Sequence, residues 1–128
     1  DLATALRVTA GTGAGVLVDS LHFDRSVSSL TDLAAVDPAR LPFAHLCDAL
    51  VHPPYSEEDL LATARAERLP PGEGQIDLAA FLSALPPDLP LGLEVPMAAL
   101  ASAEGSEAVL TRVCAATRAL LALLYPPA

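Results

Sequence analysis

The chain has 128 residues, enough for one domain with a hydrophobic core, and 52% of them are hydrophobic. Its net charge is −9, and its seven basic residues are all arginines spread along the chain, so no basic stripe favours nucleic acid as a partner. The most apolar segment, 108–124, is interrupted by Arg112 and Arg118, which indicates an amphipathic core helix rather than a membrane span. No basic region precedes an apolar run at the start, as it would in a signal peptide.

Cysteine usage points to a reducing compartment. Cys47 and Cys114 lie far apart and form no C-x-x-C motif, so they do not make a disulfide framework. We expect both to be reduced thiols of a cytoplasmic protein that pack as small apolar side chains.

Apolar periodicity, helix caps and proline pairs predict an alternation of helices and short strands. The expected elements are, in chain order, a helix at 2–10, a strand buried on both faces at 15–19, a polar loop at 20–28, a helix at 29–36, a strand at 41–48, a helix at 56–65, a rigid loop at 67–76, a helix at 78–85, a strand at 89–95, a short helix at 97–103 and a long helix at 105–124. Such alternation implies parallel strands joined by right-handed crossovers, and therefore an α/β fold.

Each expected strand carries one polar side chain near its carboxyl end: Asp19, His45 and Glu94. Because the carboxyl ends of parallel strands lie on one rim, we expect these groups to converge. Carboxylate and imidazole are ligands that a divalent metal accepts. Residue alternation places Glu94 on the same face as Gly92, which would leave room beside the site.

Each of these residues also has a purely structural interpretation. An acid after a strand, such as Asp19, is a common cap of the next helix. A single histidine on an apolar strand, such as His45, is commonly a satisfied core residue. Glu94 is harder to explain in this way, because an unpaired carboxylate buried in the apolar segment 91–95 would be costly. Their occurrence at three successive strand ends favours a site.

Four short motifs in order resemble the sugar isomerase and epimerase family with the xylose-isomerase-like TIM barrel. They are a D-x-x-H strand end at 18–22, an H-x-x-D/E strand at 43–48, an R-x-x-P-G-x-G loop at 68–77, and a last metal-binding strand at 93–96. The resemblance covers essentially the whole chain, 1–128. It implies the carboxyl-terminal part of a (βα)8 barrel, with about three parallel strands and flanking helices that match the sixth to eighth βα units.

The resemblance also implies roles for five residues. Asp19, His45 and Glu94 would bind a divalent ion such as Mn, Mg, Co or Zn. Glu94 would also act as the general base, while His22 and Arg68 would hold hydroxyls or the carbonyl oxygen of the substrate. The family's fourth ligand, a glutamate at the end of the fifth strand, is expected just before Asp1.

The implied activity is that of a metal-dependent isomerase or epimerase acting on a sugar or sugar phosphate through an enediolate. An alternative is a non-catalytic, truncated half-barrel that pairs with itself or with a missing amino-terminal half. A third interpretation is a metal-dependent endonuclease on the same barrel, which the acidic charge and the small number of histidines, three, disfavour. The expected partner is a small sugar or sugar phosphate, without nucleic acid or membrane, and a second copy or a missing amino-terminal half is a further possible partner.

Overall fold

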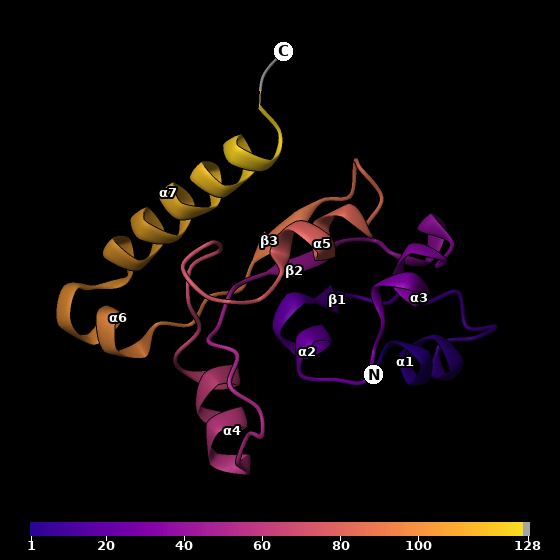
Figure 1. Cartoon of the computed structure of the whole chain (residues 1–128), viewed down its shortest axis with the longest axis horizontal. Helices are drawn as coiled ribbons and strands as arrows, with labels where there is room; N and C mark the ends of the chain where they lie inside the picture. The colour runs from indigo at the N-terminus through magenta and orange to yellow at the C-terminus, as the bar shows by residue number, and fades with distance from the viewer. Residues whose placement is uncertain (127–128) are drawn as a thin grey trace. The chain divides into compact units, whose positions relative to one another are not determined.

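The computed structural model describes residues 1–126, and these divide into two compact units (Figure 1). The first unit combines Asp1–Leu46 with Asp77–Gly92, and the second combines Cys47–Ile76 with the chain from Leu93 onward. The first contains α1 (Leu2–Val8), β1 (Val18–Asp19), α2 (Ser20–Asp24), α3 (Leu30–Ala34), a 3-10 turn (Pro38–Arg40), β2 (Ala44–Leu46), α5 (Leu78–Ser83) and most of β3 (Leu91–Leu93). The second contains α4 (Glu57–Arg65), α6 (Ala98–Glu104) and α7 (Ser106–Leu124).

The three strands form one sheet in the order β1-β2-β3, which confirms the predicted α/β class with parallel strands. Strands β1 and β2 pair so that Asp19 lies opposite His45. The N–H of Ala44 donates to the carbonyl of Pro90 (3.1 Å), just before β3. The register therefore places Asp19, at the end of β1, next to His45 in the middle of β2.

The first strand, Val18–Asp19, is shorter than expected, but both of its residues are buried, which confirms the predicted burial on both faces. Val16 and Val18 are buried, whereas Leu17 between them is 39% exposed. The apolar run is therefore open on one face only at Leu17, before β1 begins.

The prediction of a polar loop at 20–28 is wrong for its first part, because Ser20–Asp24 forms α2. Asp19 caps this helix by accepting a hydrogen bond from the N–H of His22 (3.0 Å). Leu21 is buried and α2 packs against β1 and β2, while Phe23 contacts Phe81 of α5 with ring centroids 5.5 Å apart. Burial of Leu21 and Phe23 stabilises a helix too short to show a period in the sequence.

In the second unit, α4 begins at the predicted cap. Ser56 and Asp59 form a capping box, in which each side chain bonds the other residue's backbone N–H. The two hydrogen bonds from Ser56, first from its hydroxyl and then from its backbone, lower the pKa of Asp59 below its ordinary 3.8.

The loop at 67–76 is non-helical, as predicted. It is paired to the chain on either side through the antiparallel bridges Asp48–Leu69 and Glu67–Met97. Glu73 in this loop forms an ion pair with Arg112 of α7, and its hydrogen bond raises the pKa of the guanidinium. The loop is therefore held by backbone and side-chain contacts within its own unit.

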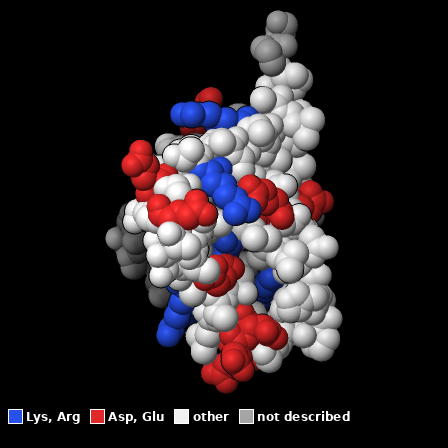
Figure 2. Space-filling view, turned by 90° about the vertical axis from the view of Figure 1, so that its left-hand side faces the viewer, with Lys and Arg blue, Asp and Glu red and all other residues white. Residues whose placement is uncertain are grey.

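Acidic residues outnumber arginines in the sequence, 16 to 7. On the face shown in Figure 2, acidic side chains alternate with separate arginines, and no continuous basic area is visible among the described residues. Cys47 is buried and Cys114 half-buried, and neither of these described cysteines is in a disulfide. No helix within 1–126 has the length and apolar character needed to cross a membrane.

Candidate metal centre

Asp19 ends β1 and begins α2, so its carboxylate serves two neighbours. One oxygen, Oδ1, accepts the hydrogen bond from the N–H of His22 at 3.0 Å. The other, Oδ2, lies 3.9 Å from Nδ1 of His45, and the Asp19 side chain is only 5% exposed. The helix-cap interpretation of Asp19 is therefore correct, and the same carboxylate also faces the imidazole on the next strand.

His45 lies in the middle of β2, and its side chain is 26% exposed. Its ring contacts Phe43 with centroids 5.5 Å apart. On the other side, a Cβ added to Gly92 would lie 2.9 Å from the ring carbon Cδ2, closer than real Cβ atoms approach their neighbours. The ring can occupy this position only because β3 has a glycine there, which confirms that Gly92 leaves room beside His45.

Glu94 follows β3, two residues beyond Gly92, and belongs to the second unit. Its side chain is 50% exposed, so the expectation of a buried carboxylate is wrong. The physical reason is that β3 ends at Leu93, which is itself 39% exposed, so the apolar letters around Glu94 do not enclose it. Its carboxylate Oε2 lies 3.5 Å from Nη1 of Arg68.

Arg68 is buried, with 3% of its surface exposed. Its guanidinium donates to protein acceptors: the carbonyl of Ala64, the carbonyl of Glu94 and the sulfur of Cys47. An exposed arginine that is available to bind a ligand would not have its donors occupied by several protein acceptors in this way. The residue expected to hold substrate is thus embedded in its own unit.

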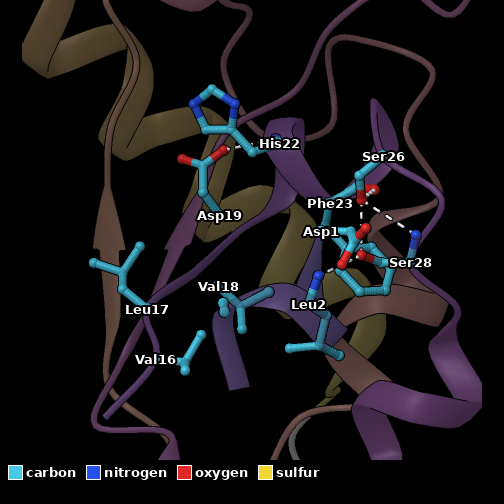
Figure 3. A pocket seen from close by; sticks show the side chains of 11 residues that line it. Asp1, Leu2, Val16, Leu17, Val18, Asp19, His22, Phe23, Ser26 and Ser28 are labelled. Carbon is cyan, nitrogen blue, oxygen red and sulfur yellow. Dashed lines mark hydrogen bonds between the residues drawn. The ribbon is translucent and has the colours of Figure 1, made fainter. Parts of the chain in front are cut away.

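His22 is exposed on α2 and lines a hollow in the first unit (Figure 3). The Asp19 carboxylate and the His22 ring lie at one end of this hollow, away from Val16 and Val18, and Ser26 and Ser28 lie at another. The hollow has a volume of about 170 Å³. Typical small-molecule pockets measure roughly 300–1,000 Å³, so this hollow alone is too small to enclose a sugar phosphate.

The structure thus brings the predicted residues together in two pairs. Asp19 and His45 meet within the first unit, and Arg68 and Glu94 meet within the second. His22 joins the first pair through its backbone. The donor set of two carboxylates and one imidazole is chemically suited to Zn²⁺, Mn²⁺ or Mg²⁺.

Sequence reasoning missed the role of Asp48. This residue is 1% exposed, and its carboxylate accepts hydrogen bonds from four backbone N–H groups, those of Ala49, Gly72, Gly74 and Ile76. A Cβ at Gly74 would lie 2.3 Å from Oδ1 of Asp48. The sequence signal for this role was the pair Gly72 and Gly74, because their closely spaced backbone N–H groups require an acceptor.

Comparisons with known proteins identify larger solved structures that share the fold of this chain. No family model matches the chain, and no curated protein matches it. The chain is similar to the crystal structure of the IolI protein with a bound zinc atom, at a TM-score of 0.71 and 23% identity over 95% of this chain and 42% of that one. It is also similar to a xylose isomerase domain protein from Alicyclobacillus acidocaldarius subsp. acidocaldarius, at a TM-score of 0.56 and 24% identity over 91% of this chain and 43% of that one.

The chain therefore spans about two fifths of the length of each of these structures. An identity of this size bears on the fold and not on the reaction. Together with the three parallel strands and their flanking helices, the similarities show that the chain has the fold of part of a xylose-isomerase-like (βα)8 barrel.

Proposed function

We propose that the chain carries the metal-binding rim of a divalent-metal-dependent isomerase or epimerase that acts on a sugar or sugar phosphate. The observation that carries this proposal is the pairing of Asp19 with His45 across β1 and β2, beside the space left by Gly92. The similarity to a zinc-bound structure and to a xylose isomerase domain protein supports the same chemistry.

Asp19, His45 and Glu94 are the proposed ligands. They are a carboxylate that ends β1, an imidazole in the middle of β2 and a carboxylate that directly follows β3. The fit is chemical: Oδ2 of Asp19 lies 3.9 Å from Nδ1 of His45, and carboxylate and imidazole are both ligands that divalent ions accept. The proposed ion is Zn²⁺, Mn²⁺, Mg²⁺ or Co²⁺.

The proposed reaction removes a proton from the carbon next to a carbonyl to give an enediolate. A proton then returns either to the former carbonyl carbon, which isomerises the sugar, or to the opposite face of the same carbon, which epimerises it and requires a second base. A bound divalent ion would supply the Lewis acid that polarises the carbonyl oxygen. The Glu94 carboxylate takes the proton from the adjacent carbon and returns it, because it is a carboxylate with 50% of its side chain open to a ligand. His22, exposed beside Asp19, orients a substrate hydroxyl.

The test measures metal and proton transfer separately. Metal content of the purified chain is determined by mass spectrometry, and a panel of ketoses, aldoses and their phosphates is incubated in D₂O to detect deuterium at the carbon next to the carbonyl. We expect Asp19→Asn, His45→Gln and Glu94→Gln each to retain less bound metal than the wild type. The matched control is His52→Gln, at an exposed histidine of the second unit. Unchanged metal content in all three ligand variants would overturn the proposal.

A second proposed role is assembly with another copy or with a partner that completes the barrel. The observation in its favour is that β1 and β3 are the outer strands of a three-stranded sheet, whereas the similar solved structures are more than twice as long. Outer strands offer backbone N–H and C=O groups for further pairing. This role is compatible with the first, because assembly would supply the rest of a pocket.

A further inference from the structure

The buried side chain of Arg68 is held by acceptors on several sides. Its Nε and Nη2 donate to the carbonyl of Ala64, at 3.2 and 3.1 Å, near the end of α4. Its Nη1 lies 3.4 Å from the sulfur of Cys47 and donates to the carbonyl of Glu94 at 3.3 Å. The planar guanidinium thus has a fixed orientation, because contacts with acceptors on two of its sides leave it little rotational freedom.

The backbone around Arg68 is joined to the same segment that carries Glu94. The N–H of Arg68 donates to the carbonyl of Pro96 at 2.8 Å, and Glu67 pairs with Met97 in an antiparallel bridge. The N–H of Ala98 donates to the carbonyl of Ala66 at 2.8 Å. Segments 66–68 and 96–98 are therefore fixed to each other, within one unit, directly after Glu94.

Nη1 of Arg68 contacts Glu94 at two points, the backbone carbonyl and the carboxylate Oε2, which is 3.5 Å away. A glutamate side chain that is 50% exposed would otherwise sample several rotamers. Contact with a buried, immobile cation removes part of that freedom, because the charge attracts the carboxylate and is itself weakly screened by water.

We infer that Arg68 is a positioning residue that orients Glu94 for metal binding, in place of the substrate-holding role that its motif implies. The inference rests on the proposed metal site. It differs from a substrate contact in that Arg68 is 3% exposed and already donates to Ala64, Cys47 and Glu94. Partners behind a metal ligand typically contribute about 10–100-fold to metal affinity when they are removed.

The experiment measures the affinity of the full chain for Zn²⁺ by competition with a chromophoric chelator. We expect Arg68→Met to weaken Zn²⁺ binding by about 10–100-fold and Arg68→Lys to weaken it less, because lysine keeps the charge and loses the fork. The control is Arg65→Met, at an exposed arginine three residues away on α4, which we expect to leave the affinity unchanged.

A double-mutant cycle separates positioning from general structural damage. In a Glu94→Gln background, Arg68→Met should cause no further loss of Zn²⁺ affinity, since its effect passes through Glu94. Thermal unfolding in EDTA identifies variants that fail to fold, and Arg68→Lys then carries the test. Equal Zn²⁺ affinity of wild type, Arg68→Met and Arg68→Lys, or an undiminished effect in the Glu94→Gln background, would overturn the positioning role alone. Absence of Zn²⁺ binding by the wild-type chain would overturn the proposed metal site as well.

Discussion

Asp48 is the residue on which the loop before α5 depends. Its carboxylate accepts from the N–H groups of Gly72, Gly74 and Ile76, at 3.0 Å each, and from that of Ala49 at 2.8 Å. A carboxylate has enough lone pairs for four such donors, and hydrogen bonds to a charged group are stronger than neutral ones. The loop that contains the R-x-x-P-G-x-G motif is therefore arranged around one buried acid.

Asp48→Asn should lower the free energy of unfolding by about 3–5 kcal/mol. The asparagine amide replaces one carboxylate oxygen with an NH₂ donor, so some of the four backbone N–H groups lose their acceptor. Urea unfolding followed by circular dichroism measures the change. The same substitution at the exposed Asp88 is the control, and we expect it to change the stability by less than about 0.5 kcal/mol. A loss of under 1 kcal/mol for Asp48→Asn would contradict this account of the loop.

The position of His45 depends on a second close contact, with Gly92. Gly92→Ala would place a Cβ 2.9 Å from Cδ2 of the ring, so the ring must turn away from its present position. We expect this variant to unfold at nearly the wild-type temperature. We expect it to bind Zn²⁺ about tenfold more weakly, because the His45 ring no longer keeps its present orientation. Calorimetric titration with Zn²⁺ and a thermal melt in EDTA give the two numbers. A large drop in melting temperature with unchanged Zn²⁺ affinity would mean that Gly92 serves only packing.

At this scale the sequence allowed part of the site to be predicted. The pairing of Asp19 with His45 and the need for Gly92 follow from strand alternation and parallel register. The exposure of Glu94 did not follow, because apolar neighbours in sequence do not determine how much of a strand end is covered. The acceptors of Arg68 could not be predicted from the sequence either, because Ala64 and Cys47 contact its guanidinium only in the folded chain.

At the scale of elements, strong local signals predicted helices well. The α4 helix begins after Ser56 as expected, because a hydroxyl cap followed by three acids is specified locally. The α2 helix was missed, because its five residues are too few to show a period and Asp19 ends a strand at the same point. Its stability comes from burial of Leu21 against the sheet, which no local pattern reveals.

The capping box of α4 predicts a specific acid response. Because the pKa of Asp59 is lowered by Ser56, the stabilisation from its charged form is complete above the ordinary pKa of 3.8 and disappears as the pH falls through the lower, folded value. We expect NMR titration of the Asp59 carboxyl carbon to give a pKa below 3.8. Ser56→Ala should raise that pKa toward 3.8, whereas Ser102→Ala on the exposed face of α6 should not move it. Identical titrations in the wild type and Ser56→Ala would rule out the capping box as the cause.

At the scale of the molecule, the sheet has two outer strands, β1 and β3, and the chain spans 42–43% of the solved structures that it resembles. The second unit also has an apolar hollow of about 300 Å³, whose lining includes Leu93, Met97, Leu110 and Val113. Leu110 is 64% exposed there. Association with a second copy would remove exposed apolar side chains of this kind from water.

We therefore expect the chain to form a dimer whose population rises with concentration in sedimentation velocity. Leu110→Glu should shift it to the monomer, because a charge in the hollow would be desolvated on association. Leu123→Glu is the matched control: it lies on the same helix, is 77% exposed and is not part of the lining of the hollow, so association should persist. If the wild-type chain sediments as a folded monomer at every concentration, self-association of this chain is wrong.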